Sequence, residues 1–295
     1  MKTLLQKRHF QFALFASATL LLFHSSLKAL VIFAYSSDLY FYILLVPIVS
    51  AYFIYSRRET AFSGIGNSYS AGTIALVFGC AIRLAGMHSV SRGTQDDFLC
   101  LMTASTLLVL VGGFIFFYGF KTFRSLAFPI CFLFLMIPLP SALNEQIVIF
   151  LQRGSASVTY WLIKATGIPI TRHGFDFSLS KMEFTVGPQC SGIRSGLYLF
   201  MTGLVFSQLY LKSQGRRIAL VFSVLPIAIF KNGLRIVTIG LLGNYISQNI
   251  ISSPLHRQGG IPFMIIGVVM VALVVVFFAR KEKEATDNGL GGISS

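Results

Sequence analysis

Long apolar runs separated by short polar loops dominate the chain. Runs of about 20 residues recur over its whole length, and a helix of that length crosses the hydrocarbon core of a bilayer. We therefore predict eight membrane-spanning helices in one domain over residues 1–280, followed by a polar, disordered cytoplasmic tail over 281–295. The predicted spans are 10–35, 39–56, 72–90, 97–119, 126–140, 190–211, 218–246 and 261–279.

The first and fifth apolar runs differ from a simple membrane-spanning helix. The first run continues past the small residues Ala16 to Ala18 as far as Tyr35, so we expect a retained span instead of a cleaved signal peptide. The fifth run is short, and it ends at Pro138 and Pro140, which stop or break a helix.

The longest stretch without a span, residues 141–189, predicts two further elements. Leu143 to Gly167 has helical apolar spacing interrupted by charges, which is typical of an interfacial or re-entrant helix. Ile170 to Val186 alternates polar and apolar residues around Gly174 and Ser180, which predicts a short β-hairpin on the outer surface. The expected fold is thus an all-α polytopic membrane protein, with this external helix and hairpin between spans five and six.

Composition supports a membrane protein and argues against a nucleic-acid binder. The chain is 55% hydrophobic and only 12% charged, about half the charge of a soluble domain. The net charge of +14 comes from basic residues in short loops between apolar runs, which is the positive-inside pattern.

The basic residues also predict an orientation. Eight spans place both termini on one side, and the loops on that side hold 13 of the 24 Lys and Arg residues. We therefore expect both termini in the cytoplasm and the segment 141–189 outside; a seven-span chain would disturb this alternation. The 13 residues are Lys2, Lys7, Arg8, Arg57, Arg58, Lys121, Arg124, Lys212, Arg216, Arg217, Arg280, Lys281 and Lys283.

The four cysteines indicate neither a metal site nor a disulfide framework. They form no CxxC pair and have no metal-type spacing with histidine. Cys80, Cys100 and Cys131 lie in apolar runs, where a buried small hydrophobe is the expected role.

Cys190 differs because it opens the sixth predicted span at its outer end. A helix N-terminus lowers a thiol pKa and favours the thiolate, which is the nucleophilic form. Pro188 is placed just before such a helix start.

Two other segments bring polar residues to the same side of the membrane. Arg235 lies 18 residues after Arg217, about 27 Å along a helix, which reaches the outer boundary. Asn232 is three residues earlier on the same helix face. His256 lies in the next outer loop.

A cysteine, an arginine and a histidine together favour acyl transfer. The thiolate would attack a peptide carbonyl, the imidazole would handle the leaving-group proton, and the cation would stabilise the oxyanion. Each residue also has a structural reading: a helix-start cysteine in packing, an arginine snorkelling to the interface, and a solvated loop histidine.

Several neighbours compete for or support these roles. Arg194 lies one predicted helix turn beyond Cys190 and could tune the thiolate or hold a substrate carboxylate. His173 on the predicted hairpin competes with His256. Asn232 could orient Arg235 or the substrate backbone, or satisfy a helix–helix hydrogen bond. Ser191 and Gly192 would give backbone room for a peptide at the helix start.

Four segments in order over residues 125–270 resemble the exosortase/archaeosortase family of integral-membrane cysteine transpeptidases. They are FPICFLFLMIPLP (128–140), QCSGIRS (189–195), PIAIFKNGLRI (226–236) and His256 followed four residues later by Gly260. The resemblance implies that Cys190, Arg235 and His256 are the catalytic residues, that the core spans 125–270, and that no cofactor or metal is required.

The resemblance also implies a substrate class and a location. The substrates would be precursor proteins with a C-terminal sorting motif, a transmembrane helix and a basic tail. Cleavage would occur on the outer face of the cytoplasmic (inner) membrane, within lipid, and an acyl-enzyme would pass the precursor to an acceptor such as a surface glycan or lipid. Such enzymes often belong to exopolysaccharide pathways.

The sequence departs from the family pattern in two places. Gln189 stands where many members carry an acidic residue before the cysteine, and the segment 36–47 lacks the histidine–glycine pair that many members have near the second span. Gly259 beside Gly260 also leaves two registers for the glycine after the histidine.

Two rival functions follow from the same residues. A purely hydrolytic membrane protease would use the same nucleophile, with water resolving the acyl-enzyme. A non-enzymatic transporter or assembly scaffold would instead use Arg235 and Lys231 to line a polar path, and it would not need Cys190.

Overall fold

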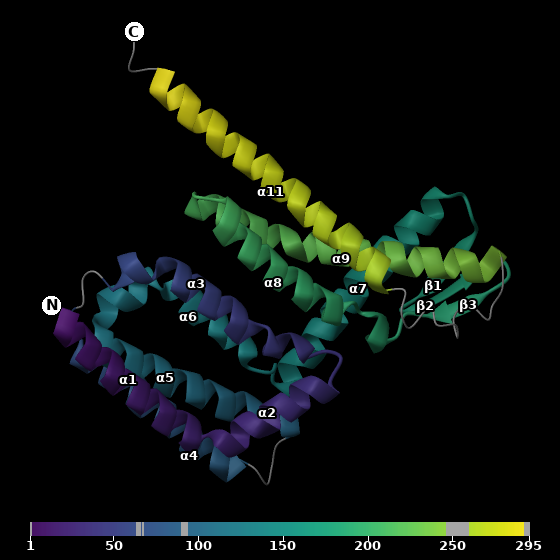
Figure 1. Ribbon diagram of the computed structural model, residues 1–295. Coiled ribbons are helices and arrows are strands. Elements are labelled where there is room, and N and C mark those ends of the chain that lie inside the picture. The colour runs from purple at the N-terminus through teal and green to yellow at the C-terminus, as the bar shows by residue number, and fades with distance from the viewer. Residues whose placement is uncertain (1, 63–65, 67, 90–93, 246–259, 292–295) are drawn as a thin grey trace. The chain divides into compact units, whose positions relative to one another are not determined.

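The chain folds into two compact units, residues 1–144 and 145–295, where the sequence predicted one domain over 1–280. Both are helical, as expected, and a small sheet lies in the second (Figure 1). The computed structural model describes residues 2–62, 66, 68–89, 94–245 and 260–291.

The described part of the first unit consists of helices. α4 and α5 pack closely, because Gly72, Gly79 and Gly86 of α4 face α5, and a Cβ at any of them would collide with α5 atoms. Small residues at such spacing let apolar helices approach one another. The helices are α1 (Lys2–Leu22), α2 (His24–Ser36), η1 (Phe41–Leu44), α3 (Val46–Ala61), α4 (Tyr69–Ser89), α5 (Gln95–Ser125), α6 (Ala127–Phe132) and η2 (Leu133–Met136).

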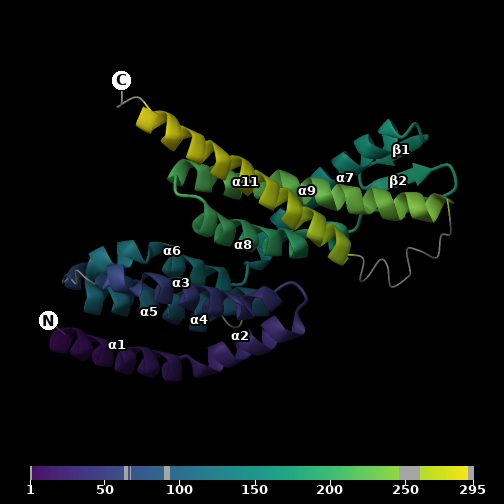
Figure 2. The same cartoon turned by 45° about the horizontal axis from the view of Figure 1, so that its top comes forward.

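The second unit combines a helix group with the sheet. α8, α9 and α11 lie side by side in both views (Figures 1 and 2) and share a buried cluster that includes Leu199, Leu220 and Val271. α7 leads into this unit from the end of the first. The elements are α7 (Ser141–Ala165), β1 (Ile170–His173), β2 (Asp176–Leu179), β3 (Glu183–Thr185), η3 (Pro188–Cys190), α8 (Ile193–Tyr210), α9 (Gln214–Tyr245) and α11 (Gly260–Gly291).

The sequence predicted a two-stranded β-hairpin, whereas the structure has a sheet of three strands. β1, β2 and β3 form an antiparallel sheet in that order. Gly174, with φ +65°, turns β1 into β2 as expected, but Ser180 lies between β2 and β3 and so marks a second turn. Phe177 and Phe184 stack across β2 and β3 with ring centroids 5.2 Å apart, and this pairing orders the third strand.

Four helices are long and apolar enough to cross a membrane: α4 over Tyr69–Met87, α5, α9, and α11 over Gly260–Ala285. Two bent pairs raise the number to six: Leu5–Leu22 with His24–Ser36, bent by 70°, and Ala127–Met136 with Ser141–Ala165, bent by 95°. The predicted count of eight is not confirmed. Two predicted spans fall short among the described residues, because α3 has only 16 residues and α8 carries polar residues along its length.

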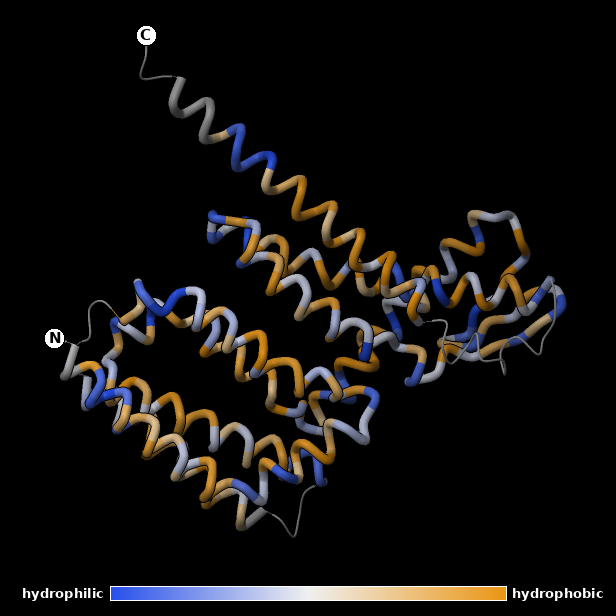
Figure 3. The backbone as a smooth tube through the Cα atoms, in the orientation of Figure 1, coloured by the Kyte–Doolittle hydropathy of each residue, from blue (hydrophilic) through white to orange (hydrophobic). Residues whose placement is uncertain are grey.

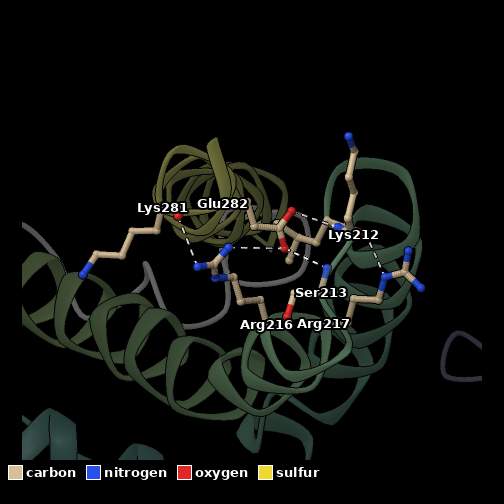
Figure 4. Close-up of polar contacts among 7 residues, drawn as sticks. Lys212, Ser213, Arg216, Arg217, Lys281 and Glu282 are labelled. Atoms are coloured by element: carbon tan, nitrogen blue, oxygen red, sulfur yellow. Dashed lines mark hydrogen bonds and ion pairs between the residues drawn. The ribbon is translucent and has the colours of Figure 1, made fainter. Parts of the chain in front are cut away.

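The last helix continues further than the sequence predicted. α11 is apolar over its first part and polar toward its end (Figure 3), and it runs to Gly291 through the segment expected to be a disordered tail. Lys, Glu and Ala in this segment favour a helix. Glu282 also fixes it, because its carboxylate accepts hydrogen bonds from the backbone N–H groups of Lys212 and Ser213 at 2.9 and 2.8 Å (Figure 4).

Candidate functional site

Cys190 lies at the end of the 3₁₀ turn η3, three residues before α8 begins. The turn is closed by the Cys190 N–H, which donates to the Gly187 carbonyl at 2.9 Å. The side chain is half-buried against the cluster formed by the sheet, α7 and α9. The nucleophile candidate is therefore held in a turn beside the sheet, and not in the first turn of a helix as the sequence predicted.

Gly192 explains why the chain can turn between Cys190 and α8. It has φ +83°, a left-handed conformation that glycine adopts without steric cost. A Cβ at this position would also lie 2.6 Å from Cγ of Asn232. Gly192 thus has two roles: it redirects the backbone into α8, and it lets α9 approach the Cys190 turn.

Asn232 holds the Cys190 turn from α9. Its Nδ2 donates to the Cys190 carbonyl oxygen at 2.8 Å and to Oγ of Ser155 on α7 at 3.0 Å. Asn232 is 1% exposed, so these bonds are shielded from water and stronger for it. Of the roles left open by the sequence, the bond to Ser155 is the helix–helix hydrogen bond, between α9 and α7. The bond to the Cys190 carbonyl was not predicted, and it fixes the backbone of the candidate nucleophile.

Cys190 and Arg235 line the same cavity, of about 50 Å³. Arg235 is one helical turn beyond Asn232, which places both residues on the side of α9 that faces the Cys190 turn. The remaining lining is mostly apolar and comes from the sheet side and from α9: Met182, Phe184, Thr185, Val186, Ile236, Ile239 and Gly240. Two of the three predicted catalytic residues are thus brought together.

Burial raises the pKa of the Cys190 thiol above its ordinary value, and the Arg235 charge and the hydrogen bond from the Gly187 backbone lower it by less. The prediction of a lowered thiol pKa is therefore wrong. It assumed a helix N-terminus at Cys190, whereas the helix starts after Gly192 and the thiol lies among apolar side chains, where the charged form is disfavoured.

The other predicted site residues occupy different environments. Ser191 is 2% exposed, and its Oγ accepts a hydrogen bond from the Ile193 N–H at 3.4 Å, so it shapes the turn. Arg194 is exposed, on the first turn of α8, and does not line the cavity. Gly260 is the first residue of α11, with open space around its Cα. His256 lies outside the described residues.

His173, the competing histidine, is exposed at the end of β1. It pairs with Asp176 across β1 and β2. It lines a polar hollow of about 450 Å³ with Asp176, Ser178 and Glu183. Phe184 and Thr185 border both this hollow and the Cys190 cavity, so the two are adjacent.

The sequence predicted no catalytic role for Lys231, a buried lysine next to this site. Lys231 is 2% exposed, and its Nζ donates to Oγ of Ser195, which in turn donates to the Gly192 carbonyl at 3.1 Å. Its spacing of four residues from Arg235 was the available signal. Asn232 therefore holds the Cys190 carbonyl, and Lys231 holds the Gly192 carbonyl through Ser195.

We expect Gly192→Ala to destabilise the protein and to lower activity. A left-handed conformation costs an L-residue about 1–2 kcal/mol, and the new Cβ would displace Asn232 from the Cys190 carbonyl. The matched control is Gly167→Ala, since Gly167 has φ +78° but no atom within 4 Å of its Cβ position. Thermal unfolding in detergent should show a larger loss for Gly192→Ala; equal losses would mean that the Asn232 contact is unimportant.

Residues 34–275 match the family model of the transmembrane exosortases (Exosortase_EpsH). The match covers both units and includes Cys190, Asn232, Arg235 and the segment with His256. No curated protein and no solved structure matches the chain.

Proposed function

Since the chain belongs to the transmembrane exosortase family, we propose that it is a membrane-embedded cysteine transpeptidase that cleaves C-terminal sorting signals of exported proteins. The observation that carries the proposal is the cavity shared by Cys190 and Arg235. A nucleophile and a fixed cation at one small cavity are what the attack on a peptide carbonyl requires.

In the proposed first step, the Cys190 thiol passes its proton to His256, and the resulting thiolate attacks the carbonyl carbon of the scissile peptide bond. Arg235 stabilises the thiolate and then the negative charge that develops on the carbonyl oxygen. The C–N bond breaks, and His256 as imidazolium gives a proton to the leaving amine. The products are a thioester at Cys190 and a released C-terminal segment that carries the membrane helix and the basic tail.

In the second step an acceptor nucleophile attacks the thioester carbonyl. Its proton passes to His256, the C–S bond breaks and the Cys190 thiolate returns. A surface glycan or lipid would give transfer, and water would give hydrolysis. We place these steps on the outer face of the cytoplasmic membrane, with both termini in the cytoplasm. The reaction as written needs no cofactor or metal.

The backbone around the nucleophile supports this assignment. Asn232, Lys231 and Ser195 hold the Cys190 and Gly192 carbonyls through partly buried hydrogen bonds, so the backbone that carries the thiol is fixed. A preorganised nucleophile avoids the entropy cost of orienting it at each turnover. A scaffold or transporter has no need for this arrangement around a cysteine.

Mass spectrometry of a processed precursor tests the transfer step. The enzyme is reconstituted with a precursor that ends in an apolar helix and a basic tail, in membranes of its host that supply acceptors. We expect the new C-terminus of the precursor to carry an added mass from the acceptor. A free carboxylate in all products would show a hydrolase and remove the transferase proposal. His256→Ala and His173→Ala, measured in the same assay, identify the histidine that acts.

A further inference from the structure

The edge strand β3 forms one wall of the Cys190 cavity and has an unpaired side. β3 pairs with β2 along one side, with Phe184 opposite Phe177. Among the described residues, no strand pairs with its other side. An unpaired edge presents a row of backbone donors and acceptors that another extended chain can join.

The register identifies which residues of β3 present these groups. The Val186 N–H donates to the Phe175 carbonyl at 2.9 Å, and the Leu179 N–H donates to the Met182 carbonyl at 2.8 Å. Successive residues of an antiparallel strand direct their backbone groups to opposite sides. Met182, Phe184 and Val186 therefore bond toward β2, while the N–H and C=O groups of Glu183 and Thr185 point to the unpaired side.

This edge is continuous with the candidate active site. Met182, Phe184, Thr185 and Val186 all line the cavity that contains Cys190 and Arg235. Thr185 precedes Cys190 by only five residues, and the intervening turn is held by Asn232. A chain paired with β3 would thus run directly past the thiol.

We propose that the precursor binds as an extended strand that pairs with the backbone of Glu183 and Thr185, which places its scissile bond at Cys190. This rests on the proposed function and specifies how the substrate is held. Main-chain pairing gives affinity for many sequences, and pockets for alternate side chains give selectivity. One enzyme could then process different precursors that share a short motif.

The surroundings of the edge indicate which side chains the strand would carry. The mostly apolar cavity has a volume of about 50 Å³, smaller than an engineered cavity of about 150 Å³ that binds benzene, so a small aliphatic group suits it better than an aromatic ring. The adjacent hollow is lined by His173, Asp176 and Glu183 and suits a polar side chain. Adjacent residues of a strand point to opposite faces, so a small apolar residue next to a polar one fits this edge.

Hydrogen exchange tests the pairing without altering the edge. Full-length Cys190→Ala enzyme in liposomes is mixed with uncut precursor, and exchange is followed over residues 182–187 by mass spectrometry with electron-transfer fragmentation. We expect slower exchange at the Glu183 and Thr185 amides on precursor binding, and little change at Phe184, which already bonds to β2. Unchanged exchange at both edge amides, with precursor bound, would overturn the inference.

Thr185→Pro provides a kinetic test, compared with Thr185→Val. Proline removes the outward N–H and is tolerated at a strand edge; valine also removes the hydroxyl bonded to Asp176 but keeps the N–H. One hydrogen bond is worth about 0.5–1.5 kcal/mol, so we expect KM for the precursor to be about threefold to tenfold higher in Thr185→Pro than in Thr185→Val.

The outcomes separate this inference from the proposed function. Alkylation of Cys190 at an unchanged rate in Thr185→Pro shows that the site is folded, and equal KM values for the two variants would then refute strand pairing. If Thr185→Pro does not fold, the exchange experiment decides alone. Cleavage of the precursor by the Cys190→Ala enzyme would instead refute the proposed cysteine chemistry, whatever the outcome at the β3 edge.

Discussion

Cys190→Ala should abolish precursor cleavage and leave the uncut precursor in the membrane. The proposed reaction passes through a thioester at this sulfur, and no other cysteine lines the cavity among the described residues. Loss of the nucleophile costs a protease on the order of 10⁶-fold in kcat, which is below detection in a processing assay. Cleavage is followed by the size of the precursor and by release of its C-terminal segment.

Cys80→Ala is the matched control for this experiment. Cys80 lies in α4, in the first unit, and is exposed instead of buried as the sequence predicted, so its loss should leave cleavage unchanged. Hydroxylamine added during turnover should convert the acyl-enzyme of the Cys80→Ala protein, but not of the Cys190→Ala protein, to a precursor hydroxamate. Continued release of the C-terminal segment by Cys190→Ala would favour the transporter or scaffold reading instead.

Sequence periodicity predicted the helical fold because apolar runs of bilayer length have few alternatives. It did not predict how the helices break and pack. The glycines at positions 72, 79 and 86 of α4 have meaning only once α5 lies against them. The 70° bend after Leu22 falls beside the polar residues His24, Ser25 and Ser26, but a prediction from average hydropathy over 10–35 treated the two helices as one straight span.

The sequence predicted that Cys190 and Arg235 belong to one site, but it did not predict the geometry around them. Cys190 and Arg235 were expected at a shared depth, and the structure adds that they line one cavity. The conformation of Gly192 could not be read from the sequence, since glycine is compatible with both helix and turn. That single left-handed residue moves Cys190 out of α8 and replaces the expected helix N-terminus with an apolar environment.

The left-handed turn at Gly192 also separates Arg194 from Cys190. Its predicted place one turn above Cys190 required both residues to be on one helix. Because Cys190 precedes the turn, Arg194 begins a new helix and is exposed. Lys231 shows the opposite case: a charged residue in an apolar run has to find a buried partner, but Ser195 as that partner depends on the packing of α8 against α9.

Variants of Arg235 should distinguish its effect on the Cys190 thiolate from its effect on the transition state of cleavage. Burial raises the Cys190 pKa and the Arg235 charge lowers it, so removal of the charge in Arg235→Gln should raise that pKa further. The thiolate is the form present above the pKa. The rise of alkylation rate with pH should therefore move to higher pH in Arg235→Gln and stay near its original position in Arg235→Lys, which keeps the charge.

Cleavage rates should respond differently from alkylation. Lysine keeps the charge but lacks the planar fork of donors that arginine offers to an oxyanion, and loss of one such donor costs about 10²–10³ in kcat. We therefore expect both variants to lose about that factor, although only Arg235→Gln shifts the alkylation profile. The measurements use protein with Cys80, Cys100 and Cys131 replaced by alanine, so that iodoacetamide reports Cys190 alone.

Arg153 and Arg194 provide comparison variants for the alkylation profile and the cleavage rate. Arg153 is exposed on α7 in the same unit, and Arg153→Gln should change neither profile nor rate. Arg194→Gln tests the competing residue, and a shift of the alkylation profile there with none in Arg235→Gln would transfer the role to Arg194. A normal cleavage rate in Arg235→Lys would show that the guanidinium acts as a charge near the thiolate and makes no paired contact with the oxyanion.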